Sequence, residues 1–295
     1  MLPKLGSPRA LAWRDARVAL AALVGLLAWE ASGLDLVLTR WWVGDGPGFA
    51  WRDHWLTSGV LHEGGRALGW LVLGLLLYDA WRPIVGRPTE GPMEGPMEGR
   101  MNRRTEGSTE VSTDRPTHAP TGSPTDAPPD ATPDATPDAP THAPTRAQRW
   151  RAIGVVLAAL LIVPALKRFS STSCPWDLAE FGGLAAYVPH WRPGVADGGP
   201  GHCFPSGHAV ASFAFFGVYF LWRDFRPRLA RCILAGVLGM GLLFGWAQWV
   251  RGAHFPSHTL WSAWLCWVLA AALSARAPGR GEHARGFGHR LAKPR

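Results

Sequence analysis

Six long apolar runs alternate with polar segments along the chain of 295 residues. They cover about 16–38, 67–81, 150–166, 205–222, a run ending at Val250, and 256–274. Runs of this length predict helices that cross a bilayer. We therefore expect an all-α polytopic membrane protein with six transmembrane helices, the last four forming a bundle. Glu30 and Asp35 are costly inside a bilayer, so the first span is expected to end early.

One polar segment interrupts this pattern, from 83 to 148. It is rich in Pro, contains short repeats and has almost no large apolar residues. Such a composition cannot bury enough surface to offset the entropy of ordering, so we predict a disordered linker and favour it over a partner-binding tract. The expected divisions are 1–82, with two helices and an outside loop; 83–148, the linker; 149–277, the core; and 278–295, a basic tail.

The formal net charge of +8 does not indicate a nucleic-acid-binding protein. Most Arg residues flank apolar runs, and no basic stripe with interleaved aromatic residues is present. Six spans place the N-terminus, the linker, the 223–231 turn and the tail on one side, and all are rich in Arg. The positive-inside rule makes that side cytoplasmic. We expect a multi-pass protein of the cell (inner) membrane, whose Trp residues lie at the interfaces.

The stretch His202-Cys-Phe-Pro-Ser-Gly-His208 lies at the start of the fourth run. Pro205 suits a first helical turn, and the N–H groups and hydroxyl at Ser206 and Gly207 suit an anion at a helix N-terminus. His208 can donate a proton near neutral pH. A second stretch, Arg251-Gly-Ala-His-Phe-Pro-Ser-His258, repeats this plan at the start of the last run.

These motifs resemble the type 2 phosphatidic acid phosphatases, relatives of the vanadium haloperoxidases. The resemblance covers about 150–277 and rests on the residues 205–208 and 252–257, with Lys167 and Pro175-Trp176 as a weaker part. It implies that His254 is the nucleophile, that His208 is the general acid, and that Lys167, Ser206 and Gly207 bind phosphate. No metal or cofactor is required, and the substrate is expected to be a membrane lipid phosphate or diphosphate.

Three positions depart from the family pattern. Cys174 replaces an Arg before Pro175, and Gln248 replaces an Arg six residues before the nucleophile. We expect Arg251, about one helical turn away, to bind phosphate, with Arg168 or Arg192 as further substitutes. His258 replaces an Asp that would orient the attacking imidazole. A neutral His258 stabilises positive charge less, unless Asp177 or Asp197 reaches it.

Other assignments remain open at this point. A phosphotransferase between lipids would use the same site, and a non-catalytic headgroup-binding protein would keep only the fold. A haloperoxidase is disfavoured because those relatives are soluble. His254 and His258 have the spacing of a zinc pair that His202 and His208 could complete, but Pro256 interrupts the helix between them.

Two further features lie in the outside loops. Cys174 and Cys203 stand next to the motifs, and we predict a disulfide between them if that side is oxidising; closing a loop of about 30 residues would contribute about 3 kcal/mol. His62 and Arg66 are four residues apart. We favour an interfacial anchor for this pair over a contact with a phosphate or headgroup.

Overall fold

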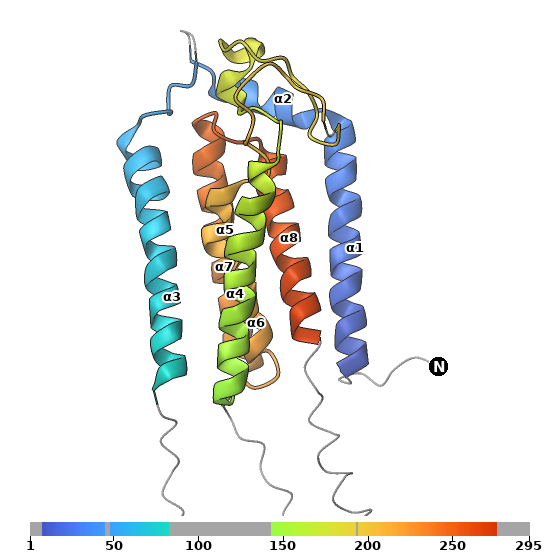
Figure 1. Cartoon of the computed structure of the whole chain (residues 1–295), viewed down its shortest axis with the longest axis vertical. Helices are drawn as coiled ribbons and strands as arrows, with labels where there is room; N and C mark the ends of the chain where they lie inside the picture. The colour runs from blue at the N-terminus through green and yellow to red at the C-terminus, as the bar shows by residue number, and fades with distance from the viewer. Residues whose placement is uncertain (1–7, 45–47, 83–142, 193, 276–295) are drawn as a thin grey trace, which may run out of the picture. The chain divides into compact units, whose positions relative to one another are not determined.

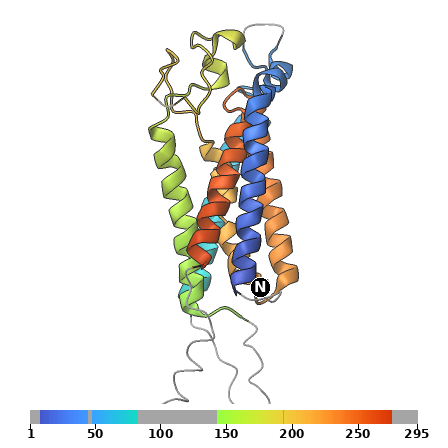
Figure 2. The same ribbon diagram turned by 90° about the vertical axis from the view of Figure 1, so that its right-hand side faces the viewer.

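The computed structural model describes residues 8–44, 48–82, 143–192 and 194–275. The longer helices lie lengthwise beside one another (Figures 1 and 2). In the described residues there are isolated bridges but no strands. The helices are α1 (Pro8–Ser32), α2 (Leu34–Thr39), α3 (Gly65–Trp81), α4 (Arg146–Arg168), α5 (Gly207–Phe213), α6 (Phe216–Trp222), α7 (Pro227–Val250) and α8 (Pro256–Ala275), with a π-helix at Leu56–Gly64 and short 3₁₀ helices at Arg40–Trp42, Pro175–Asp177 and Ala179–Phe181.

Several of these helices are long and apolar enough to cross a membrane. Among the described residues four qualify, and a fifth is added if α1 and the helical segment after it count as one span. That pair bends by 71° at Gly33, whose φ of 67° needs a glycine. The chain is thus an all-helical, multi-pass membrane protein, and the early end of its first span is observed.

The fourth predicted span is the reason that six full spans are not found. It consists of two seven-residue helices, α5 and α6, and is too short to qualify as a span. Phe213, Ala214 and Phe216, at the break, are buried in the core. This segment therefore lies inside the bundle, packed by other helices.

Two predicted boundaries need correction. The second span begins at Leu56, well before residue 67, because the nine π-helical residues Leu56–Gly64 continue directly into α3. The predicted linker 83–148 ends too late, since Thr145 caps α4 in a reciprocal pair with Gln148. The rest of the linker, 83–142, and the predicted tail lie outside the described residues.

Small residues let the helices of the core approach closely. A side chain on Gly241 would overlap the ring of Phe213, and one on Gly217 would come within 3.0 Å of Val155. Gly65 is likewise packed against Phe244, because a Cβ at this position would lie only 2.7 Å from the phenyl ring. These contacts join α3 and α5 to α7, and α6 to α4.

The loops at one end of the bundle are tied to the N-terminal helices. Asp35 of α2 accepts hydrogen bonds from the backbone N–H and the hydroxyl of Ser257, at the start of α8. A carboxylate at this position satisfies a free helix donor and complements the helix dipole. The loop between α4 and α5 folds over the same end, where Trp176 N–H donates to the Gly252 carbonyl at 2.9 Å.

Candidate active site

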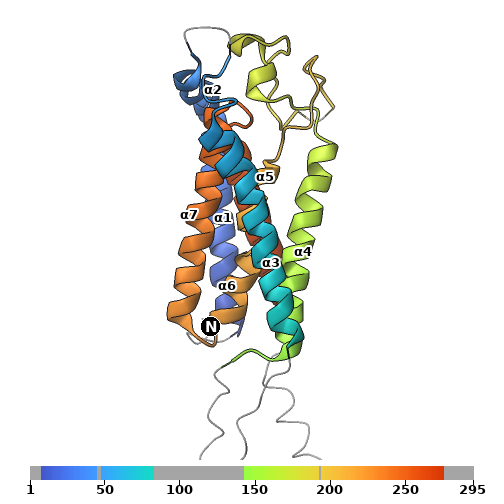
Figure 3. The same cartoon turned by 90° about the vertical axis from the view of Figure 1, so that its left-hand side faces the viewer.

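The predicted site residues meet at one end of the bundle. The end of α4 carries Lys167, the start of α5 carries Ser206 and Gly207, and the turn from α7 to α8 carries His254 (Figures 1 and 3). Lys167 Nζ lies 3.9 Å from the position that a Cβ on Gly207 would take. Helix α5 begins at Gly207 with Ser206 as its N-cap, so Pro205 precedes the cap and does not form the first turn as expected.

His254 is held rigidly in a buried loop. Its side chain is 2% exposed, and the backbone N–H groups of Ala253 and His254 both donate to the Gln248 carbonyl, at 2.8 and 3.2 Å. Gly252 permits this turn with a φ of 71°. Burial, followed by the charge of Lys167, holds the pKa of His254 well below its usual range. At neutral pH its imidazole is therefore neutral and has a free lone pair.

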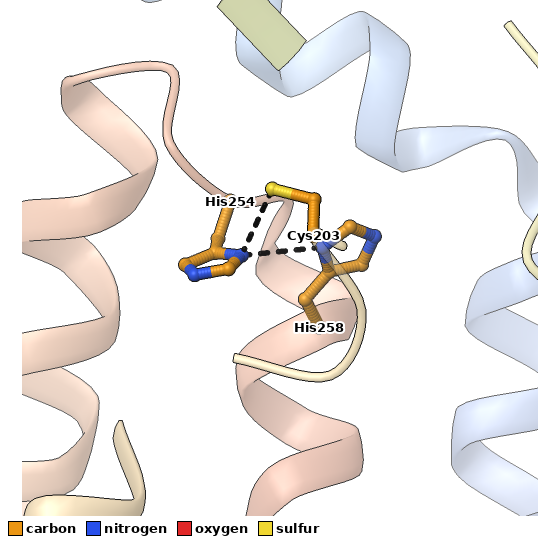
Figure 4. Close-up of side chains that lie close together, drawn as sticks. All are labelled: Cys203, His254 and His258. Carbon is orange, nitrogen blue, oxygen red and sulfur yellow. Dashed lines mark hydrogen bonds between the residues drawn. The ribbon is translucent and has the colours of Figure 1, made fainter. Parts of the chain in front are cut away.

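His254 contacts two groups through one ring nitrogen. Its Nδ1 lies 3.5 Å from His258 Nδ1 and 3.5 Å from Cys203 Sγ. Figure 4 shows that the other nitrogen of His254 points away from both. If Nδ1 carries the proton and donates a hydrogen bond to His258, Nε2 keeps the lone pair that a nucleophile needs.

His208 lies against a residue from outside the two motifs. Its ring lies against that of His62 with the centroids 3.8 Å apart and the planes tilted by 30°, and His62 Nδ1 lies 3.0 Å from Gln248 Nε2. The interpretation of His62 as an interfacial anchor did not predict these contacts. Gln248, which replaces an Arg of the family pattern, holds His62 beside the proposed acid. The spacing of His62 and Arg66 in the sequence drew attention to this pair, but it did not show that His62 contacts His208.

Several buried polar atoms of the site have no hydrogen-bond partner within the described residues. They are Ser206 Oγ, His208 Nδ1 and Arg251 Nη1. Arg251 is oriented by its Nε, which donates to the Arg52 carbonyl at 2.7 Å. Burial lowers the pKa of Arg251 from its ordinary value, but the guanidinium remains a cation. Unsatisfied donors beside cations form a suitable environment for an anion.

Of the residues expected to replace the missing arginines, Arg251 lies in the site, but Arg168 and Arg192 do not. Arg168 and Arg192 are exposed. The cations whose charges act on His208 are Lys167, Arg251 and Arg66. Arg66 comes from α3, and its guanidinium also pairs with Glu63 at 2.9 Å. Positive charge is thus recruited from a helix outside the motifs.

The carboxylate expected near His258 is not Asp197. Asp197 accepts hydrogen bonds from Ser173 and from Gly199 instead. Asp177 lies in a turn where its carbonyl accepts from Leu184 and Ala185. Two carboxylates of the N-terminal helices approach this region: Asp35 bonds to Ser257, and Glu30 of α1 lies 3.0 Å from His190 Nε2. The sequence analysis identified Glu30 only as a carboxylate that is costly to place inside a bilayer. No sequence pattern pointed to His190.

The cysteines of the outer loops are joined. Cys174 and Cys203 form a disulfide with a Cα–Cα distance of 5.1 Å. Among the described residues, Cys203, His254 and His258 bring possible metal-ligand atoms within 4.8 Å of one another (Figure 4), but His202 and His208 are not part of this group. Because a cysteine in a disulfide has no thiolate to offer, this form of the protein provides only two of the three ligands.

Comparison with known families assigns most of the second half of the chain to a domain family. Residues 148–281 match the model of the PAP2 superfamily. This segment is a PAP2 domain. No curated protein and no solved structure matches the chain significantly. The PAP2 domain contains Lys167 and both histidine motifs, whereas Glu30, Asp35 and His62 come from helices before it. The protein therefore combines a PAP2 domain with N-terminal helices that contact it.

Proposed function

We propose that this protein is an integral membrane phosphatase that hydrolyses a lipid phosphate or diphosphate through a phosphohistidine. The observation that carries the proposal is the arrangement around His254. A neutral, buried imidazole with one free nitrogen shares one end of an apolar bundle with Lys167 and with the unpartnered donors of Ser206 and Arg251. Positioned donors of this kind stabilise the charge on a phosphoryl group in the transition state.

The first step forms the covalent intermediate. His254 Nε2 attacks phosphorus, the bond from phosphorus to the lipid oxygen breaks, and His208 gives a proton to that departing oxygen. A phosphate anion bound beside His208 favours the protonated form that this role requires. Lys167, Arg251 and the N–H groups at the start of α5 hold the non-bridging oxygens.

The second step releases phosphate. Water attacks phosphorus, the bond to His254 breaks, and His208 takes up a proton from the water, which replaces the one that it gave up in the first step. His254 returns to its neutral form, so atoms and charge balance over the cycle. All of these roles are filled by side chains and backbone groups of the chain.

A lipid substrate is supported by the surroundings of the first motif. A cavity of about 630 Å³ lies against Phe204 and Pro205 and has mostly apolar walls, including Leu27, Leu166 and Leu265. An acyl or prenyl chain suits such a surface, with its phosphate at the polar end. In the predicted topology, the Arg-rich segments and the candidate site lie on opposite sides of the membrane. Because Arg-rich segments favour the cytoplasmic side, the active site is expected on the extracytoplasmic face of the cell membrane.

The test is phosphate release by the full-length protein in detergent, from a panel of lipid monophosphates and diphosphates. We expect wild type to release phosphate and His254→Ala to lose roughly 10⁴-fold or more. His54→Ala is the matched control, because this histidine contacts Trp51 and Trp55 in the outer loop and lies outside the proposed site.

The same experiment separates the alternatives. Phosphate transfer only when a second lipid is supplied would indicate a phosphotransferase. Full activity of His254→Ala would disprove the phosphohistidine. A folded wild type that binds lipid phosphates without turnover would indicate a headgroup-binding protein.

A further inference from the structure

A buried carboxylate from outside the PAP2 domain lies beside His190, whose ring contacts that of His258. Glu30, near the end of α1, has a side chain only 5% exposed. Its Oε1 accepts a hydrogen bond from Trp261 Nε1 at 2.9 Å and lies 3.0 Å from His190 Nε2. Within the described residues no Lys or Arg forms an ion pair with it, and the His190 contact is an ion pair only when that imidazole is protonated. A buried charge held this way is costly and calls for an explanation.

His190 connects Glu30 to His258. The His190 ring stacks on Phe204 with the centroids 3.9 Å apart and the planes 10° from parallel. Both rings present an edge-to-face contact to His258, at 5.8 Å for His190 and 5.3 Å for Phe204. These contacts fix the position of His190 and, through it, the environment of the far side of His258.

The two ring nitrogens of His258 point in opposite directions. One of its ring nitrogens, Nδ1, approaches His254, whereas Figure 4 shows the other pointing away from His254, to the side where the N-terminal helices lie. His258 is 1% exposed, so water does not screen charges around it. A charge placed beside this ring would therefore be screened little.

The other carboxylates in this region bond to groups other than His190. Asp35 accepts from Ser257 and Trp29, and Asp197 accepts from Ser173 and Gly199. Neither replaces the Asp that the family pattern would place at 258. Glu30 is the carboxylate whose partner, His190, contacts the His258 ring.

Phosphorylation of His254 creates a positive imidazolium, and a neutral His258 brings no negative charge to it. We propose that Glu30, oriented by His190 and Trp261, supplies the negative charge that is missing at position 258, and that Glu30 and His190 are positioning residues for the nucleophile. Neither touches the phosphate. This inference rests on the proposed function and deepens it.

The charge environment is defined by groups on several elements. The ionisable groups that act on His254 are Lys167 of α4, His208 of α5 and His258 of α8. His190 and Lys167 act on His258, while Asp35 and Tyr187 lie within electrostatic reach of Glu30. All of these remain in place in a Glu30 variant, so the variant changes one charge.

Glu30→Gln keeps the side-chain shape and removes the charge. We expect kcat to fall about tenfold with KM changed less than twofold, because the loss acts on the charged intermediate and not on substrate binding. Removing a negative charge disfavours the imidazolium, so the pKa of His254 decreases. The acid limb of the kcat/KM profile should therefore move to lower pH. Glu30→Asp should recover part of kcat.

The coupling to His190 has its own test. His190→Phe keeps a ring on Phe204 but removes the nitrogen that lies 3.0 Å from Glu30, and it should lower kcat by a similar factor. The double variant should lose little more than either single one, since the two residues act as a unit. Glu180→Gln, an exposed carboxylate of the same outer loops, is the matched control and should match wild type.

Three outcomes would overturn the inference. The first is an active wild type with an unchanged kcat and pH profile in Glu30→Gln. The second is a loss of activity that follows the melting temperature and leaves the acid limb in place, since this indicates a structural role alone. The third is an inactive wild type, which would remove the proposed function as well; the first two leave that function standing.

Discussion

The two histidine motifs have similar sequences but opposite surroundings. In the first, at the start of α5, Ser206 Oγ and His208 Nδ1 are buried and have no hydrogen-bond partner among the described residues. In the second, at the start of α8, Ser257 is bonded to Asp35 and the His254 loop is bonded to the Gln248 carbonyl. The same pattern of Pro, Ser and His therefore leaves the serine hydroxyl of the first motif without a partner among the described residues and bonds that of the second to a carboxylate.

This difference teaches what each motif contributes. Unpartnered donors are costly unless a ligand satisfies them, so the first motif is suited to bind phosphate and to exchange a proton. Satisfied donors hold a loop still, so the second motif is suited to aim a nucleophile. The following variants test this division.

The largest effect is expected from removing the proposed acid. His208→Ala should lower kcat by about 10²–10⁴-fold for a lipid phosphate, whose alkoxide leaving group needs a proton. With p-nitrophenyl phosphate the loss should be much smaller, because that leaving group is weakly basic. His254→Ala should lose activity with both substrates. Equal losses of His208→Ala on the two substrates would contradict the acid role.

A smaller effect, on stability, is expected at the glycine of the second motif. Gly252→Ala places a side chain at a φ of 71°, which costs about 1–3 kcal/mol, and also overlaps the ring of Phe49. Gly198→Ala has a φ of 82° but open space around it, so it carries the strain without the overlap. Melting temperatures in detergent should fall further for Gly252→Ala. Equal melting temperatures would show that the loop adjusts freely.

The smallest effect compares two buried serines. Ser206→Ala removes a hydroxyl without a partner among the described residues, so activity should fall about tenfold while the melting temperature stays the same or rises. Ser262→Ala removes a hydroxyl that contacts the Ser206 and His258 carbonyls at 2.8 and 2.9 Å, and should cost about 1 kcal/mol of stability. Phosphate release and thermal unfolding measure both. A clear loss of stability in Ser206→Ala would mean that its hydroxyl is not free.

Much of the architecture follows from local pattern. Apolar runs indicated the helices, and Pro256 correctly marked the start of α8. The predictions failed where packing overrides pattern. The apolar run after Pro205 is a buried, broken pair of helices, and the polar stretch before residue 67 is already helical from Leu56. Length and hydropathy do not show whether a run faces lipid or other helices.

The sequence by itself determined the family resemblance, the helical class and the two motifs, because Pro, Gly and His act through local backbone geometry and side-chain chemistry. Only the tertiary structure decided which distant residues join them. Glu30, His62 and Arg66 lie more than 100 residues before His208. Hydropathy identified Glu30 only as a residue that is costly to bury in a bilayer. Their roles depend on how α1 and α3 pack against the PAP2 domain, since charge and hydrogen bonding act over a few ångströms of space and not along the chain.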